Sequence, residues 1–181
     1  MATLASMPRD RSRAPSSTSP ADAVRTVVPM PELVTVRNAV VSDAHRVAEL
    51  CGVLGYPVTG DLMAERLARV LDASEDTVLV AVLPSGKVVG WLHASERQLL
   101  EMGRYAEILG LVVDASHRGL GVGRGLIARA EAWTAARGLS DLHVRSNIVR
   151  LESHPFYQRL GYVRVKTQHA YRKALSTDPA R

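Results

Sequence analysis

The sequence predicts a mixed α/β fold in a single domain, and three observations lead to this expectation. Short β-branched runs alternate with segments of helical periodicity, in the order β-α-α-β-β-β-α-β-α-β. A turn with three glycines in five positions, Gly119 to Gly123, joins a nearly continuous apolar run to a helix. The chain of 181 residues with a 46% apolar fraction is large enough for one hydrophobic core.

The N-terminal half of the domain combines β-branched runs with two stretches of helical periodicity. Ser42 is a suitable N-cap for the first helix, because its hydroxyl can accept a hydrogen bond from a free helical N–H, and Gly55 is a typical stop. The elements expected here are a strand over 33–37, a helix between Ser42 and Gly55, a helix over 61–71, strands over 77–83 and 87–94, and a polar connection over 96–104.

The C-terminal half carries the glycine turn between a buried strand and a helix. Gly138 is a typical end for that helix, and Pro155 suits the first turn of the next one. The elements expected here are a strand over 107–113, a helix to about residue 137, a strand over 142–146, a helix over 153–160, and a closing strand or hairpin arm over 162–172.

Both ends of the chain are predicted to lie outside the domain, which is expected to cover residues 33–175. Residues 1–32 are rich in Ser, Pro, Ala and Arg and lack apolar periodicity, so they are expected to form a disordered leader. This segment also lacks the apolar core of a secretory signal. Residues 176–181 are expected to be a flexible tail.

Composition excludes several classes of site. The single cysteine, Cys51, allows no internal disulfide, and the six histidines lack metal-ligand spacing, so no metal is expected. No apolar run reaches the roughly 20 residues of a membrane span. These features favour a cytoplasmic protein that does not bind membranes.

The net charge of +5 is concentrated in the half that contains the glycine turn. Residues 117–181 hold twelve Lys/Arg and four Asp/Glu, a balance of +8. An anionic small ligand, nucleic acid or a solvated basic surface would each account for this charge. The basic half has few aromatic residues to stack on bases and no zinc-finger or RRM signature, so nucleic acid is not expected.

The glycine turn has the chemistry of a phosphate site, because a helix N-terminus presents free N–H groups and a partial positive charge. A nucleotide P-loop would end in Gly-Lys-Ser/Thr, whereas this turn continues Gly123-Arg124-Gly125. A dinucleotide fingerprint normally follows the first strand of its domain, whereas this turn follows the fourth. Neither of these two nucleotide sites fits.

The segment Arg118-x-x-Gly121-x-Gly123 resembles the cofactor motif of the GNAT N-acetyltransferase superfamily, Gln/Arg-x-x-Gly-x-Gly/Ala. The resemblance continues through Asn147 and Arg150 to the run Phe156-Tyr157-Gln-Arg-Leu-Gly161-Tyr162 and covers about residues 33–173. Ser153 takes the usual Ala position of that downstream motif, and Pro155 is an uncommon insert.

This resemblance implies a domain with a central, mostly antiparallel sheet, splayed between its fourth and fifth strands and covered by helices on both faces. It also implies acetyl-CoA as cofactor, with the pyrophosphate at the glycine turn and the pantetheine arm paired with the fourth strand. The cofactor-binding residues expected from it are Leu111, Val112, Val113, Arg118, Gly119, Leu120, Gly121, Val122, Gly123, Arg124, Asn147 and Tyr157.

The implied reaction is direct attack of a primary amine on the thioester in a ternary complex. Tyr157 occupies the position of the acid that meets the leaving thiolate, and Glu107 that of the base that deprotonates the amine. His93 and water are the alternative bases. Cys51 lies on the apolar stripe of the first helix, so a covalent route through it is not expected.

The acceptor implied by the resemblance is a small-molecule amine. A protein or peptide acceptor, or a non-catalytic module that binds acetyl-CoA, are the alternatives, and a homodimer is left open. The sequence motifs do not cover the segments that would shape the acceptor pocket.

Overall fold

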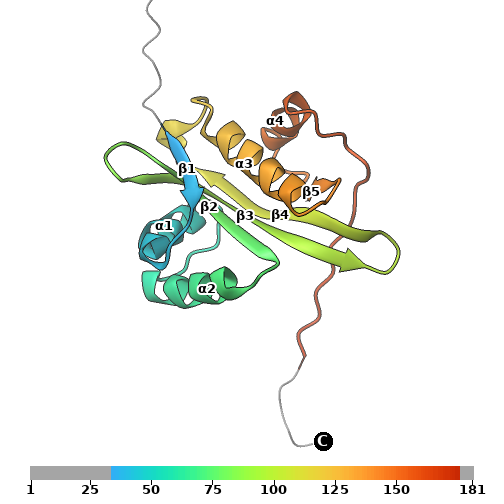
Figure 1. The fold of residues 1–181 in the computed structure, drawn as a ribbon, viewed down its shortest axis with the longest axis horizontal. Coiled ribbons are helices and arrows are strands. Elements are labelled where there is room, and N and C mark those ends of the chain that lie inside the picture. Colours follow the sequence, from blue (N-terminus) through green and yellow to red (C-terminus); the bar gives the residue numbers. More distant parts are fainter. Residues whose placement is uncertain (1–33, 176–181) are drawn as a thin grey trace, which may run out of the picture. The chain divides into compact units, whose positions relative to one another are not determined.

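The computed structural model describes residues 34–175 (Figure 1). The predicted leader over 1–32 and the predicted tail over 176–181 lie outside the described residues.

The described part is built on one five-stranded sheet in the order β1-β2-β3-β4-β5. Strands β1 to β4 pair with one another in antiparallel order, and only the last pair, β4 with β5, is parallel. This confirms the predicted central, mixed and mostly antiparallel sheet. The strands are β1 (Thr35–Asn38), β2 (Asp76–Val82), β3 (Val88–Leu99), β4 (Gly103–Val113) and β5 (Leu142–Val144).

Helices cover both faces of this sheet (Figure 1). Alternate residues of β2 divide the core, since Val78 and Val80 pack with the first two helices whereas Leu79 and Ala81 pack with α3. The helices are α1 (Ala44–Val53), α2 (Gly60–Asp72), α3 (Val122–Ala136) and α4 (Ser153–Arg159), with short 3₁₀ turns over Val41–Asp43 and Ala115–His117. None of the helices within residues 34–175 is long and apolar enough to cross a membrane.

The predicted N-cap Ser42 is wrong by one residue. Ser42 lies inside the first 3₁₀ turn, and Asp43 occupies the N-cap position of α1. The Asp43 carboxylate does not cap the helix. It accepts hydrogen bonds from the Arg37 guanidinium at 2.7 and 2.8 Å and from the Val40 N–H at 2.9 Å, which fixes the entry of the chain into α1.

The predicted polar connection over 96–104 is also wrong, because β3 and β4 continue through it as a long hairpin. Its polar residues pair with one another instead of ending the strands. Glu96 accepts from Arg104 at 2.6 Å and from Arg137, the C-cap residue of α3, at 2.8 Å. Charged partners of opposite sign stabilise neighbouring strands, so polarity here does not indicate a loop.

The closing strand predicted over 162–172 is not formed. Its alternation of apolar and basic residues is typical of a strand, yet Val163 and Val165 remain 83% and 80% exposed. A strand needs a neighbour for its hydrogen bonds, and this segment pairs with none of the strands within residues 34–175.

The sheet opens between its two parallel strands. Pairing of β4 with β5 covers only three positions and ends at Ile108 opposite Val144. One residue later a bulge leaves Leu109 without a partner on β3. Gly110 then passes under the Trp91 ring, where a Cβ atom would lie 2.8 Å from two ring carbons. This divergence confirms the predicted splay between the fourth and fifth strands.

Candidate active site

A cavity of about 230 Å³ opens where β4 and β5 diverge. Its wall combines the end of α1, the middle of β4, the end of β5 with the following turn, and α4. The lining residues are Leu54, Tyr56, Ile108, Leu109, Gly110, Leu111, Val144, Arg145, Ser146, Asn147, Arg150, Ser153 and Tyr157. Three predicted site residues, Leu111, Asn147 and Tyr157, are therefore brought to one cavity.

The glycine turn forms the N-terminus of α3 as predicted. Gly119 and Gly121 have φ angles of +77° and +84°, a backbone region that side chains disfavour. Gly121 is the N-cap, and the first helical hydrogen bond runs from the Gly125 N–H to its carbonyl. The N–H groups from Gly121 to Arg124 therefore have no partner within the helix, and no side chain of the described residues caps them.

Gly123 has a packing role in addition to its place in the turn. A Cβ atom on Gly123 would lie 3.1 Å from the Phe156 ring of α4 and 3.7 Å from Val113. The glycine thus lets the first turn of α3 approach both α4 and the end of β4. This close approach brings the predicted phosphate site next to the helix that carries Tyr157.

The free edge of β4 can be identified from Arg118. Its Nε donates to the Val113 carbonyl at 3.3 Å. The next residue, Asp114, donates its N–H to the Val89 carbonyl of β3 at 2.8 Å, so Val113 directs its own backbone groups to the edge that faces away from β3. Successive residues of a strand direct their N–H and C=O groups to opposite edges, so Leu111 shares this edge with Val113. Because β5 pairs no further than Ile108, the backbone groups of Leu111 meet the cavity instead of another strand.

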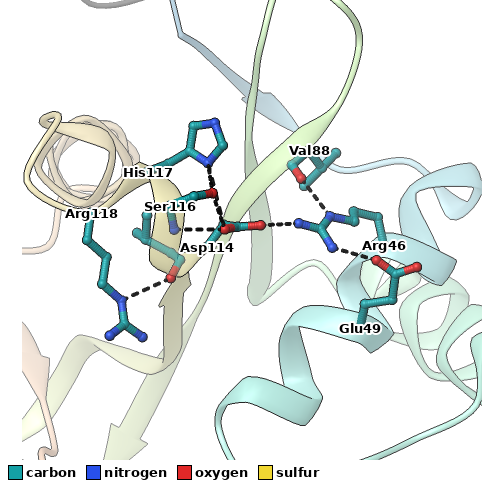
Figure 2. A network of polar contacts seen from close by, with 8 residues as sticks. Arg46, Glu49, Val88, Asp114, Ser116, His117 and Arg118 are labelled. Atoms are coloured by element: carbon teal, nitrogen blue, oxygen red, sulfur yellow. Dashed lines mark hydrogen bonds and ion pairs between the residues drawn. The ribbon is translucent and has the colours of Figure 1, made fainter.

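A polar network fixes the end of β4 against the rest of the sheet (Figure 2). Asp114 accepts from the Ser116 N–H at 3.0 Å and the Ser116 hydroxyl at 2.6 Å, and it pairs with Arg46 of α1. Arg46 also donates from Nε to the Val88 carbonyl at 3.0 Å. Hydrogen bonds from Ser116, together with Arg46, hold the pKa of Asp114 well below its usual range.

Tyr157 projects from α4 into the cavity, beside Ser146, Asn147 and Arg150. Its ring also packs edge-on against Phe156 and Tyr162, with centroids at 5.2 and 5.7 Å. Burial raises the pKa of the Tyr157 phenol above its usual value, and the charge of Arg150 opposes this increase. The phenol is therefore protonated at neutral pH and available as a hydrogen-bond donor.

Asn147 begins the turn that connects β5 to α4. Its side-chain oxygen accepts from the Val149 N–H at 3.2 Å, and its carbonyl accepts from the Arg150 N–H at 2.9 Å. The Arg150 carbonyl accepts in turn from the Ser153 N–H at 3.0 Å. Asn147 is thus a turn residue whose side chain also lines the cavity.

Glu107 is buried on the strand that forms the cavity wall, but it is not itself a lining residue. One carboxylate oxygen lies 2.6 Å from Nε of Arg145, and the other lies 3.7 Å from Nε of Arg97. Arg145 follows β5 and lines the cavity. A direct contact between Glu107 and a substrate amine would require one of these ion pairs to open.

The structure places His93 and Cys51 away from this cavity. Both line a second, mostly apolar cavity of about 220 Å³ between the sheet and the first two helices. His93 also contacts Asp76 at 3.1 Å, and burial raises the pKa of the Cys51 thiol. Neither side chain shares a cavity with Tyr157.

Sequence reasoning missed four residues of this region. Arg145 and the aromatic residue Tyr56 carry no motif, and their place at the cavity follows only from the divergence of β4 and β5. The pair of Arg46 and Asp114 was missed because its members are 68 positions apart. The only local signal was the Asp-Ala-Ser sequence, which is typical of a side-chain turn.

We expect Asp114→Asn to remove a pH-dependent part of the stability. The pKa of Asp114 is depressed in the folded chain, so its contribution is fully present above the unfolded value of about 4 and is lost as the pH falls below it. Urea unfolding of wild type and variant should therefore differ clearly at pH 7 and less at pH 3. Asp72→Asn is an exposed control at the end of α2. Its difference from wild type in urea unfolding should be the same at pH 7 and pH 3. An equal difference at both pH values for Asp114→Asn would contradict this role.

Comparison with known proteins agrees with the geometry. The family model described as Acetyltransferase (GNAT) family matches residues 44–162. Aminoglycoside N(6')-acetyltransferase type 1 of Stenotrophomonas maltophilia is 29% identical over 132 residues, which cover 71% of this chain and 85% of that protein.

Two solved structures share the fold. Aminoglycoside 6'-N-acetyltransferase AAC(6')-Ih of Acinetobacter baumannii has a TM-score of 0.70 at 18% identity and covers 79% of this chain and 99% of its own. AAC(6')-Iy, in complex with the bisubstrate analogue CoA-S-monomethyl-acetylneamine, has a TM-score of 0.70 at 21% identity and covers 78% and 99%. The chain belongs to the GNAT acetyltransferase family and is an acetyl-CoA-dependent acetyltransferase.

Proposed function

We propose that this enzyme transfers the acetyl group of acetyl-CoA to a primary amine of a small molecule, by direct attack within a ternary complex. The observation that carries the proposal is the cavity at the divergence of β4 and β5, which joins the free edge of β4 to Tyr157 and opens toward the end of α1. Several relatives are named as aminoglycoside acetyltransferases, and this supports a small-molecule acceptor.

The pyrophosphate of the cofactor is proposed to lie at the N-terminus of α3. Six consecutive residues would approach it, with free N–H groups from Gly121 to Arg124 and with the partial positive charge of the helix behind them. These residues are Gly119, Leu120, Gly121, Val122, Gly123 and Arg124. Arg118 is proposed to hold the end of β4 through Val113 while its terminal nitrogens face the phosphates.

The pantetheine arm is proposed to pair with the free edge of β4. Leu111 and Val113 direct their backbone groups to that edge, whereas Val112 directs its own toward β3 and contributes its buried side chain to the core. Asn147 lies on the opposite wall of the cavity, where its side-chain amide can donate to the arm. An extended chain of amides is matched by strand-like pairing of this kind.

Acetyl-CoA supplies a thioester that a neutral amine attacks, with a thiolate as the leaving group. Tyr157 is proposed to donate a proton or a hydrogen bond to that sulfur. The reference pKa of a phenol lies near 10 and that of a thiol near 8.5, so the sulfur is the weaker base, and a hydrogen bond from the phenol stabilises its negative charge without complete proton transfer. The position of Tyr157 in the cavity wall supports this role.

Glu107 is proposed to receive the proton of the amine through water. Its burial beside the cavity wall supports the proposal, whereas its two ion pairs argue against direct contact with the amine. His93 lines the other cavity, which disfavours it as the base. The raised pKa of Cys51 likewise disfavours a route through an acyl-cysteine.

The wild-type enzyme tests the proposal when it is mixed with acetyl-CoA and a panel of amines, peptides and polyamines. Calorimetry should show binding of acetyl-CoA, and release of the free thiol should depend on a small-molecule amine. Release that depends only on peptides would favour a protein acceptor. Binding without release for any acceptor would favour a non-catalytic module.

We expect Tyr157→Phe to lower kcat about 10- to 100-fold with little change in the affinity for acetyl-CoA, because only the hydroxyl is lost. Steady-state kinetics and calorimetry measure the two quantities. Tyr162→Phe is a matched control, since that hydroxyl bonds Glu131 outside the cavity. A kcat unchanged by Tyr157→Phe would exclude the acid role.

Glu107→Gln separates two roles of the carboxylate. If Glu107 accepts the proton, the low-pH limb of kcat/KM should move or disappear in the variant. If the carboxylate only positions Arg145, the pH profile should keep its shape while the KM of the acceptor rises. The second result would leave water as the base.

A further inference from the structure

We infer that the acceptor is a primary amine that also carries an anionic group, a carboxylate, phosphonate or phosphate, close to its nitrogen. The inference rests on the proposed function, because it concerns the acceptor side of the same cavity. It narrows the substrate class beyond the relatives' names, which include aminoglycoside acetyltransferases, whose acceptors are polycations, and a glucosamine-6-phosphate N-acetyltransferase, whose acceptor carries a phosphate.

The first observation is the sign of the charge in the cavity wall. Two of its residues, Arg145 and Arg150, are cationic, and no Asp or Glu is among the residues that line it. A cationic acceptor entering this space would meet two guanidinium groups, of which only Arg145 has a carboxylate partner, the buried Glu107 behind the cavity wall. A wall of this kind attracts anions and repels a polycation.

The second observation is how Arg150 is held. Its Nη2 donates to the Leu54 carbonyl at the end of α1, at 3.1 Å, across the cavity from β5. No carboxylate among residues 34–175 lies within ion-pair distance of it. Because a backbone carbonyl is neutral, the charge of Arg150 is fixed in place without being neutralised.

The third observation is the orientation of Arg145. Glu107, with a side chain that is only 7% exposed, lies against Nε of Arg145 at 2.6 Å, while the Arg145 side chain is 74% exposed. The buried carboxylate therefore holds the stem side of the guanidinium. The two terminal nitrogens form no ion pair among the described residues and keep the fork geometry that suits an oxyanion.

The net charge around Glu107 and the two lining arginines also favours an anionic acceptor. Glu107 is shared by Arg145 and Arg97, and Arg150 lines the same cavity as Arg145. These three guanidinium groups and one carboxylate have a net charge of +2. The phosphates of acetyl-CoA are assigned to the N-terminus of α3, beyond the far end of the free β4 edge. These guanidinium groups are thus left for the acceptor.

Matched pairs of amines that differ only in the anionic group test the inference. Suitable pairs are 2-aminoethylphosphonate with ethanolamine and glucosamine 6-phosphate with glucosamine, compared at equal concentrations of neutral amine, with neamine as the polycation. We expect kcat/KM to be about 10- to 100-fold higher for the anionic member of at least one pair. Added salt should raise the KM of that member more than the KM of its neutral partner.

Variants then assign the preference to the two arginines. Arg150→Gln and Arg145→Gln should each reduce the anionic-to-neutral ratio at least about tenfold, Arg150→Lys should restore part of it, and Arg129→Gln, an exposed charge change on α3, should leave it unaltered. Higher kcat/KM for the neutral amines or for neamine would overturn the inference and leave the proposed function intact. So would equal losses for both members of a pair in the two variants. Binding of acetyl-CoA without thiol release for any amine would instead refute the proposed function itself.

Discussion

The structure depends on the unequal extent to which β3 and β5 pair with β4. β3 pairs with β4 along almost its whole length, whereas β5 runs parallel to it and pairs at only three positions. A strand that is paired on one edge and unpaired on the other has free N–H and C=O groups, which need another hydrogen-bond partner. The bulge at Leu109 and the glycine under Trp91 mark the point of separation, and the cavity begins there.

Other features of the site serve to keep this separation in place. Arg46 and Asp114 tie the end of β4 to α1 and to the start of β3, so the strand cannot follow β5. Gly123 allows α3 to pack on Phe156, which sets α4 and therefore Tyr157 against the opposite wall. The same divergence exposes Arg145, which follows β5. Its buried partner Glu107 contacts Nε and so orients the Arg145 guanidinium. The proposed cofactor side and the proposed acceptor side thus follow from one backbone arrangement.

Many elements of the fold and of the proposed cofactor site were predictable from local sequence. The glycine turn, the helix that follows it and the apolar strand before it depend on neighbouring residues, and each was found where the pattern indicated. The hairpin over 96–104 was missed because its stability comes from cross-strand charge pairs such as Glu96 with Arg104, which look like a polar loop in sequence. The strand expected over 162–172 had the right alternation but finds no partner among the described strands. The surroundings of Glu107 could not be predicted, since Arg97 and Arg145 reach it from different strands.

The cofactor is proposed to bind along the free edge of β4 and at the start of α3. Residue-resolved amide hydrogen exchange, measured with and without acetyl-CoA, can show whether it does. We expect exchange to slow for Leu111 and for Gly121 to Arg124 when acetyl-CoA is present. Val112, whose N–H already faces β3, should change little. Protection that appears elsewhere, or equally at Leu111 and Val112, would contradict the assignment of this edge to the cofactor.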